Sequence, residues 1–185
     1  MTIKGDLLMT NKDLVNSFYI SPEPNMRHQN LFYQSKALLN PKLTNPEGCI
    51  KIRTVYSYGL HYPIITSIRS NDFDLWIKNT VRVSVTTSKH SGLFHGTEAY
   101  STETHLSLHL PLCSSRPIEW TTLDQLIINV KNQVDIKREA LLEIPARCHA
   151  KLAKAQAEID NLHSQLVLLY DFVQKYNLKG VSLFA

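Results

Sequence analysis

The last third of the chain carries an apolar repeat that constrains the fold more than any other feature of the sequence. Two positions of a seven-residue repeat stay small or apolar over about four heptads. One position is filled by Leu152, Ile159, Leu166 and Val173, and the other by Cys148, Ala155, Leu162, Leu169 and Tyr176. This pattern predicts a helix from about Ala146 to Asn177. One side of that helix must pack against this chain or against a second copy of it.

A second helix is predicted just before this one. Thr121 or Thr122 can cap a helix that begins at Leu123, since a hydroxyl there can accept a bond from a free backbone N–H. Pro145 interrupts the helical pattern, so the two helices form either an antiparallel hairpin or one kinked rod. Apolar residues widen the stripe of the second helix after Leu166. Its second half is therefore expected to contact more than one element.

The middle of the chain shows the period-two alternation of β-strands. In residues 50–58, isoleucines and tyrosines fall on one face, whereas Lys51, Arg53 and Ser57 fall on the other. Similar β-prone runs occur at 64–68, 73–78, 81–86 and 104–110. The turns between them predict a three- or four-stranded antiparallel meander, with a polar loop over 88–104 before the last strand.

These patterns predict an α+β chain: a small antiparallel β-meander followed by a long C-terminal helical hairpin. The expected divisions are an irregular N-terminal segment at 1–47, the β domain at 48–115 and the helical hairpin at 116–185. Short helices are predicted at 11–19 and 30–39 of the first segment, because prolines follow both.

Composition limits the class of protein. The net charge is only +4, far below the charge of a dedicated DNA-binding domain. Residues 1–13 lack the apolar core of a signal peptide, and no apolar run reaches the roughly 20 residues of a membrane span. The three cysteines have no CxxC spacing and predict neither a disulfide framework nor a zinc site. We therefore expect a cytoplasmic protein with reduced thiols, no cofactor and no membrane partner.

The block from Val55 to His90 concentrates the candidate binding chemistry. Its hydroxyls, cations, histidines and tyrosines could hold a phosphate or a carboxylate, or stack on bases. The candidate residues are Arg82, Ser84, Thr86, Thr87, Ser88, Lys89, His90, Tyr56, Tyr58 and His61. If Val81–Thr86 is a strand, then Arg82, Ser84 and Thr86 share its outward face. With Lys89 and His90 they would form a recognition surface at the strand end.

Catalytic and metal chemistry find little support in the sequence. No Gly-x-Ser-x-Gly motif and no phosphate-binding glycine loop occur. His105 and His109 are four residues apart, but leucines alternate with them as in a strand. Strand geometry would separate the pair by roughly 13 Å, too far for one ion to bridge. No catalytic residue and no metal ligand is assigned, although His61 or His90 could serve as an acid or base in a cryptic enzyme.

The same block resembles a small uncharacterised domain of phage and mobile-element proteins. The resemblance covers the motif at 56–64, which reads YSYGLHYPI, and the run at 83–90, which reads VSVTTSKH. It implies a phage or plasmid protein that acts without catalysis by binding a host macromolecule, for example as an inhibitor of a host defence complex. The alternative is a nucleic-acid-binding module that uses the basic and hydroxyl-bearing residues. The C-terminal helix could also make the protein a homo-oligomer.

Overall fold

A seven-stranded mixed sheet forms the centre of the computed structural model. The structure describes residues 10–20, 25–39, 49–60, 62–82, 84–94, 100–112 and 122–184. The strands are β1 Asn25–His28, β2 Leu31–Leu39, β3 Cys49–Ser57, β4 Pro63–Arg69, β5 Asp74–Asn79, β6 Tyr100–Ser101 and β7 His105–Leu110. The helices are α1 Asn11–Ile20, α2 Val85–Gly92, α3 Leu123–Leu142 and α4 His149–Lys175. The α+β class predicted from the sequence is confirmed.

The strand order is β1-β2-β3-β4-β5-β7-β6, and every neighbouring pair is antiparallel except β5 and β7. Apolar residues cover both faces of the sheet and form two separate cores. One core joins Ile50, Ile52 and other strand residues to α3 and α4. The other joins α1 to Val55, Trp76 and Phe94. Lys51 and Arg53 lie on the face of β3 that points away from α3 and α4, as the alternation predicts.

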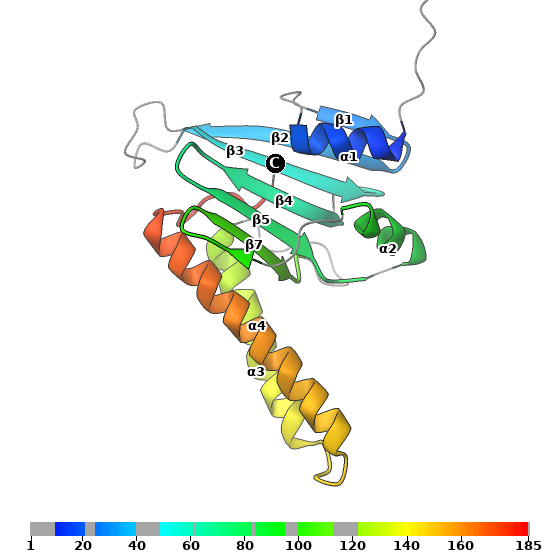
Figure 1. The fold of residues 1–185 in the computed structure, drawn as a ribbon, viewed down its shortest axis with the longest axis vertical. Coiled ribbons are helices and arrows are strands. Elements are labelled where there is room, and N and C mark those ends of the chain that lie inside the picture. Colours follow the sequence, from blue (N-terminus) through cyan, green and yellow to red (C-terminus); the bar gives the residue numbers. More distant parts are fainter. Residues whose placement is uncertain are drawn as a thin grey trace, which may run out of the picture.

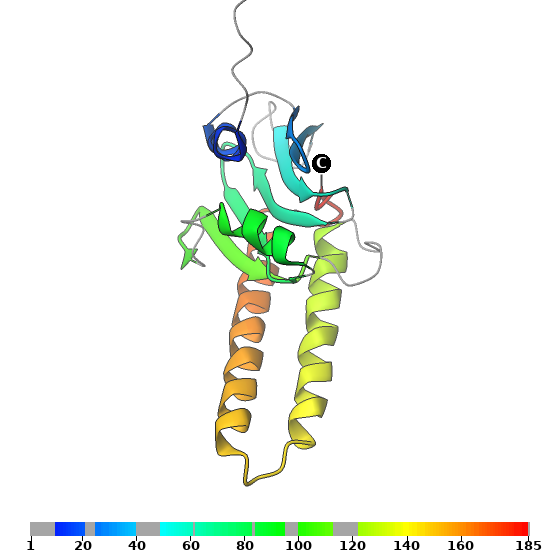
Figure 2. The ribbon, with the colours of Figure 1, turned by 90° about the vertical axis from the view of Figure 1, so that its right-hand side faces the viewer.

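The helical hairpin is present, and its distal half projects away from the sheet (Figures 1 and 2). Thr122 caps α3, since its side chain accepts a bond from the backbone N–H of Gln125. The heptad ladder faces inward along α4. Leu166, Leu169 and Val173 are buried against the sheet and α3, while Cys148, Leu152 and Ala155 near the tip are only half-buried. The second half of the helix therefore meets the sheet and α3 together; assembly through this helix stays a prediction.

The predicted helix at 30–39 is wrong, because this segment is strand β2. All nine of its residues pair in register with β3, from Leu31 opposite Ser57 to Leu39 opposite Cys49. Leu31 and Tyr33 are buried in the α1 core, whereas Phe32 stacks on Tyr56 on the other face. The segment is placed by a partner strand that follows it in the sequence. The proposed division after residue 47 consequently separates two paired strands.

The predicted strand at 81–86 is also wrong, because helix α2 begins at Val85. The side chain of Asn79 explains why the chain leaves the sheet there. Its amide nitrogen donates to the carbonyl of Pro63 at 2.7 Å, and its oxygen accepts from the amides of Val81 and Leu112 at 3.0 and 3.1 Å. The chain crosses over through α2, and β7 joins β5 in parallel, so the meander ends at β5.

Candidate functional site

Helix α2 replaces the strand end that the sequence predicted as a recognition surface. Ser84 begins this helix through a reciprocal capping box with Thr87. The Ser84 hydroxyl accepts from the Thr87 amide at 3.1 Å, and the Thr87 hydroxyl accepts from the Ser84 amide at 2.9 Å. Such a box satisfies amides that the first turn of a helix leaves free. The hydroxyl-rich run therefore starts a helix rather than ending a strand.

The inner face of α2 is fixed to the sheet through Thr87 and His90. Thr87 is buried, and His90 Nδ1 lies 2.7 Å from the hydroxyl of Ser57 at the end of β3. The ring of Tyr58 stacks on the imidazole with centroids 6.0 Å apart. Burial lowers the pKa of His90 below its usual value of 6.5. Because Ser57 is fully buried, this Ser–His pair anchors the helix and does not present a nucleophile.

We expect the burial of His90 to make stability depend on pH. Since the pKa of His90 is lower in the folded protein, the unfolded chain takes up a proton first as the pH falls. The contribution is complete above pH 6.5 and is lost as the pH falls through the lower folded value. His90→Gln should flatten the fall in urea midpoint below pH 6.5, because glutamine keeps a hydrogen-bonding group without titrating. An unchanged pH profile in the variant would contradict this assignment.

The outer face of α2 lines two adjoining hollows that share Arg82 and Ser88. One hollow of about 380 Å³ extends to Lys78 and His109 of neighbouring strands β5 and β7. The other, of about 570 Å³, is open and extends past Ser84 to Lys89. Ser88 and Ser91 are about one helical turn apart on α2, and Ser84, which caps the first turn, lines the same surface. We call this surface the α2 groove.

The α2 groove contains no carboxylate among the described residues that line it. Arg82 and Lys89 are exposed. Lys78 is half-buried; its ammonium donates to the carbonyl of Phe94 at 2.8 Å, and burial lowers its pKa. Cations and hydroxyls without nearby acids are suited to an anion that carries several acceptor oxygens.

The predicted binding residues thus separate into several groups. Arg82, Ser84, Ser88 and Lys89 line the α2 groove, whereas Thr87 and His90 face the sheet and Thr86 is half-buried. Tyr58 is 51% exposed, but Tyr56 is 2% exposed and packs on Phe32, so it cannot stack on a ligand. Burial raises the pKa of Tyr56 to about 12. His61 lies outside the described residues.

Lys78, Ser91 and His109 belong to the groove but were missed by sequence reasoning. The serine spacing 84, 88 and 91 is the signal that could have identified a helix face here. Lys78 and His109 carry no such signal, because they become neighbours only through the parallel pairing of β5 with β7.

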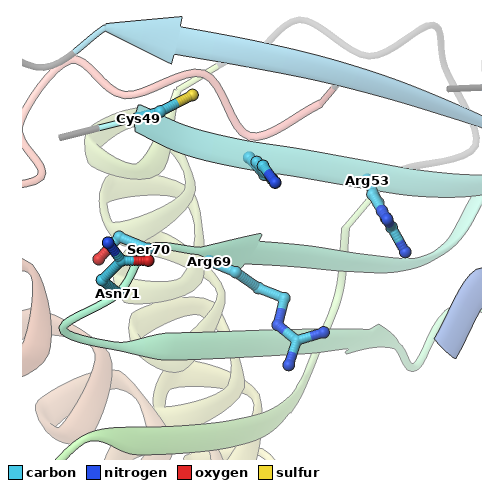
Figure 3. A pocket seen from close by; sticks show the side chains of 6 residues that line it. Cys49, Arg53, Arg69, Ser70 and Asn71 are labelled. Atoms are coloured by element: carbon cyan, nitrogen blue, oxygen red, sulfur yellow. The ribbon is translucent and has the colours of Figure 1, made fainter. Parts of the chain in front are cut away.

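A second basic hollow lies on the same face of the sheet, at the opposite ends of β3 and β4 (Figure 3). It measures about 290 Å³ and is lined by Cys49, Lys51, Arg53, Arg69, Ser70 and Asn71. Figure 3 shows Arg53 and Arg69 projecting from the neighbouring strands, with Cys49, Ser70 and Asn71 toward one end. We call this hollow the sheet pocket.

The described residues form neither a metal-binding cluster nor a membrane-spanning helix. No three of their His, Cys, Asp or Glu side chains come together in a way that could hold a metal ion. None of the helices in the described part of the chain is long and apolar enough to cross a membrane. Cys49 and Cys148 are free thiols.

Comparison with known proteins identifies no relative of this chain. No family model, no curated protein and no solved structure matches the chain. The α2 groove and the sheet pocket are therefore the features of the chain that point to a function.

Proposed function

We propose that this chain is a non-enzymatic binding protein that holds single-stranded nucleic acid along the α2 groove. The observation that carries the proposal is the lining of the groove: three cations and the hydroxyl of Ser91, with no described carboxylate. The hydroxyl of Ser88 is donated to the backbone carbonyl of Ser84 at 2.9 Å, and the hydroxyl of Ser84 caps α2. Phosphodiesters are singly charged and spaced along a strand, so they suit cations that are spread over a surface.

The scale and the aromatic content of the surface favour a single strand over a duplex. Three cations are fewer than a duplex-binding domain uses, and the net charge is +4. Tyr58 lies beside α2, where it stacks on His90, and about half of its surface is exposed. Because His90 is on the inner face of α2, a strand would have to cross this helix from the groove to stack a base on the ring of Tyr58.

The salt dependence of binding tests this proposal. Affinity for a fluorescent oligonucleotide should fall with salt, because each neutralised phosphate releases counterions. In a variant with Arg82→Ala and Lys89→Ala, the slope of log affinity against log salt should shrink by about 1.4, at ~0.7 per phosphate contact. Fluorescence anisotropy between low and physiological salt measures both slopes.

A matched control removes two cations from the projecting hairpin. Lys151 and Lys154 are both exposed on α4, so Lys151→Ala with Lys154→Ala changes the net charge equally and should leave the slope unaltered. Equal slopes in all three proteins, or no binding at low salt, would refute the proposal.

A host-protein partner, as the phage-like block implies, is the second candidate function. The observation that favours it is the projecting hairpin. Ile136 is 63% exposed and Leu142 is 85% exposed there, and the surface between them is open to solvent. Single exposed apolar residues are normal on a protein surface, so the favouring observation is the projection of the hairpin itself, which leaves these side chains accessible to a partner. If oligonucleotides do not bind, the host-protein partner becomes the better candidate. Inhibition of a host defence complex is one form that this function could take.

A further inference from the structure

The sheet pocket brings together like charges that the stability of the sheet does not require. Lys51 on β3 lies directly opposite Arg69 on β4, and Arg53 lies two residues further along the same face. Like charges directly opposite each other on paired strands are destabilising. An anion between them would remove that cost.

The two arginines are oriented by contacts within the chain. Arg53 donates from Nη1 to the backbone carbonyl of Phe18 at 2.9 Å, which fixes the guanidinium without neutralising it. Arg69 forms an ion pair with Asp74 at 3.0 Å and lies over the ring of Trp76, 5.4 Å from its centroid. Side chains that are already ordered lose less conformational entropy when a ligand binds.

Lys51 completes an excess of two positive charges. It is exposed and makes no hydrogen bond or ion pair with any described residue. The carboxylate of Asp74, which pairs with Arg69, offsets one of the three positive charges and leaves a net charge of +2. Asp74 itself is not among the described residues that line the pocket. A dianion would balance this charge, whereas a carboxylate or a phosphodiester would balance only half of it.

Neutral donors lie at the end of the pocket. The hydroxyl oxygen of Ser70 accepts from the amide of Asp72 at 3.0 Å, so the hydroxyl hydrogen can be donated to a ligand. Asn71 is exposed and supplies an amide N–H. The volume of about 290 Å³ holds roughly ten water molecules at ~30 Å³ each, enough for a phosphate group and a small substituent.

We propose that the sheet pocket binds a phosphomonoester. At neutral pH this group carries a charge of about −1.5 to −2 on three acceptor oxygens. Arg53 and Arg69 donate the guanidinium N–H groups that Phe18 and Asp74 leave unused, Lys51 adds a point charge, and Ser70 and Asn71 donate from the end of the pocket. This site is separate from the α2 groove and does not depend on the function proposed for that groove.

Calorimetric titration with inorganic phosphate and with phenyl phosphate tests the proposal. Both should bind, and Lys51→Ala should weaken them about 10-fold or more, the range for losing a hydrogen bond to a charged group. Lys51→Gln gives a second variant that removes the charge and keeps most of the side chain. Because Lys51 is exposed and has no described partner, neither change should unfold the protein.

Lys36→Ala is the matched control. Lys36 is exposed on the neighbouring strand β2, opposite Ile52, and so lies on the other face of the sheet. Phosphate affinity should not change in this variant, nor in Arg82→Ala with Lys89→Ala. Absence of phosphate binding, an equal loss in the Lys36 variant, or equal affinity for acetate and dimethyl phosphate would overturn the proposal.

Oligonucleotides with and without a 5′-phosphate separate the two sources of this group. Tighter binding of the phosphorylated strand, lost in Lys51→Ala, would identify the end of a nucleic acid as the ligand. Equal binding of the two strands, with phenyl phosphate still bound, would identify a small free phosphomonoester. If the variant with Arg82→Ala and Lys89→Ala loses strand binding but still binds phosphate, the α2 groove and the sheet pocket are separate binding sites.

Discussion

Phe18→Ala should lower the free energy of unfolding by about 3–5 kcal/mol, the range for removing a buried phenylalanine. Phe18 is fully buried and is the centre of the α1 core. Its ring meets those of Tyr33, Trp76 and Phe94 edge-on, with centroids 5.7–5.8 Å apart. The cavity would lie under a helix of ten residues, which is too short to persist without its packing.

Ile20→Ala in the same helix is the control. Ile20 is 83% exposed, so its truncation should change the free energy of unfolding by less than about 0.5 kcal/mol. Urea unfolding followed by circular dichroism measures both variants. A loss below 1 kcal/mol for Phe18→Ala would show that the α1 core closes over the cavity or contributes little.

The same substitution links the α1 core to the sheet pocket. The backbone carbonyl of Phe18 accepts the hydrogen bond from Arg53. The position of the Arg53 guanidinium therefore depends on the docking of α1 against the sheet. Amide hydrogen exchange should therefore accelerate at Leu14 and Phe18, which identifies α1 as the element that loosens first.

The sequence predicted those elements whose pattern is local. The heptad ladder predicted α4 and the apolar side on which it packs, because period 3.5 over many turns fits only a helix with one buried side. The hydroxyls of Thr121 and Thr122 marked the start of α3, and Thr122 is the residue that caps it. The alternation at 50–58 correctly placed Lys51 and Arg53 together on the face that later proved to hold the sheet pocket.

Elements fixed by distant partners could not be read from the sequence in this way. Strand β2 is determined by its pairing with β3. The run Val81–Thr86 alternates like a strand, yet Asn79 ends the sheet and Ser84 caps a helix, since these two side chains satisfy the backbone groups that a strand would have paired.

The candidate sites show the same limit. Arg82 and Lys89 were identified because they lie beside the hydroxyl run, while Lys78 and His109 come from two strands joined by a parallel crossover. Arg69 meets Lys51 only through the register of β3 and β4. A one-residue shift in that register would put Arg69 on the opposite face, so no argument from composition could have located the pocket.

Leu169→Ala should lower the free energy of unfolding by about 2–5 kcal/mol, whereas Leu168→Ala beside it should cost less than about 1 kcal/mol. Leu169 is fully buried among α3, α4 and the sheet, and Leu168 is 40% exposed on the same turn. The pair differs in burial and not in chemistry. Urea midpoints for the two variants therefore measure how much stability the docking of α4 on the sheet supplies.

The Leu169→Ala variant also tests whether the heptad ladder packs within one chain or joins two copies. If the ladder serves packing within one chain, Leu169→Ala lowers stability independently of protein concentration, and light scattering gives the same mass for wild type and variant. If it joins two copies, the midpoint rises with concentration, because association stabilises the folded state by mass action. The half-buried residues near the tip, such as Leu152, are only lightly packed within the chain, so Leu152→Ala should be nearly neutral in the first case and should reduce the mass in the second.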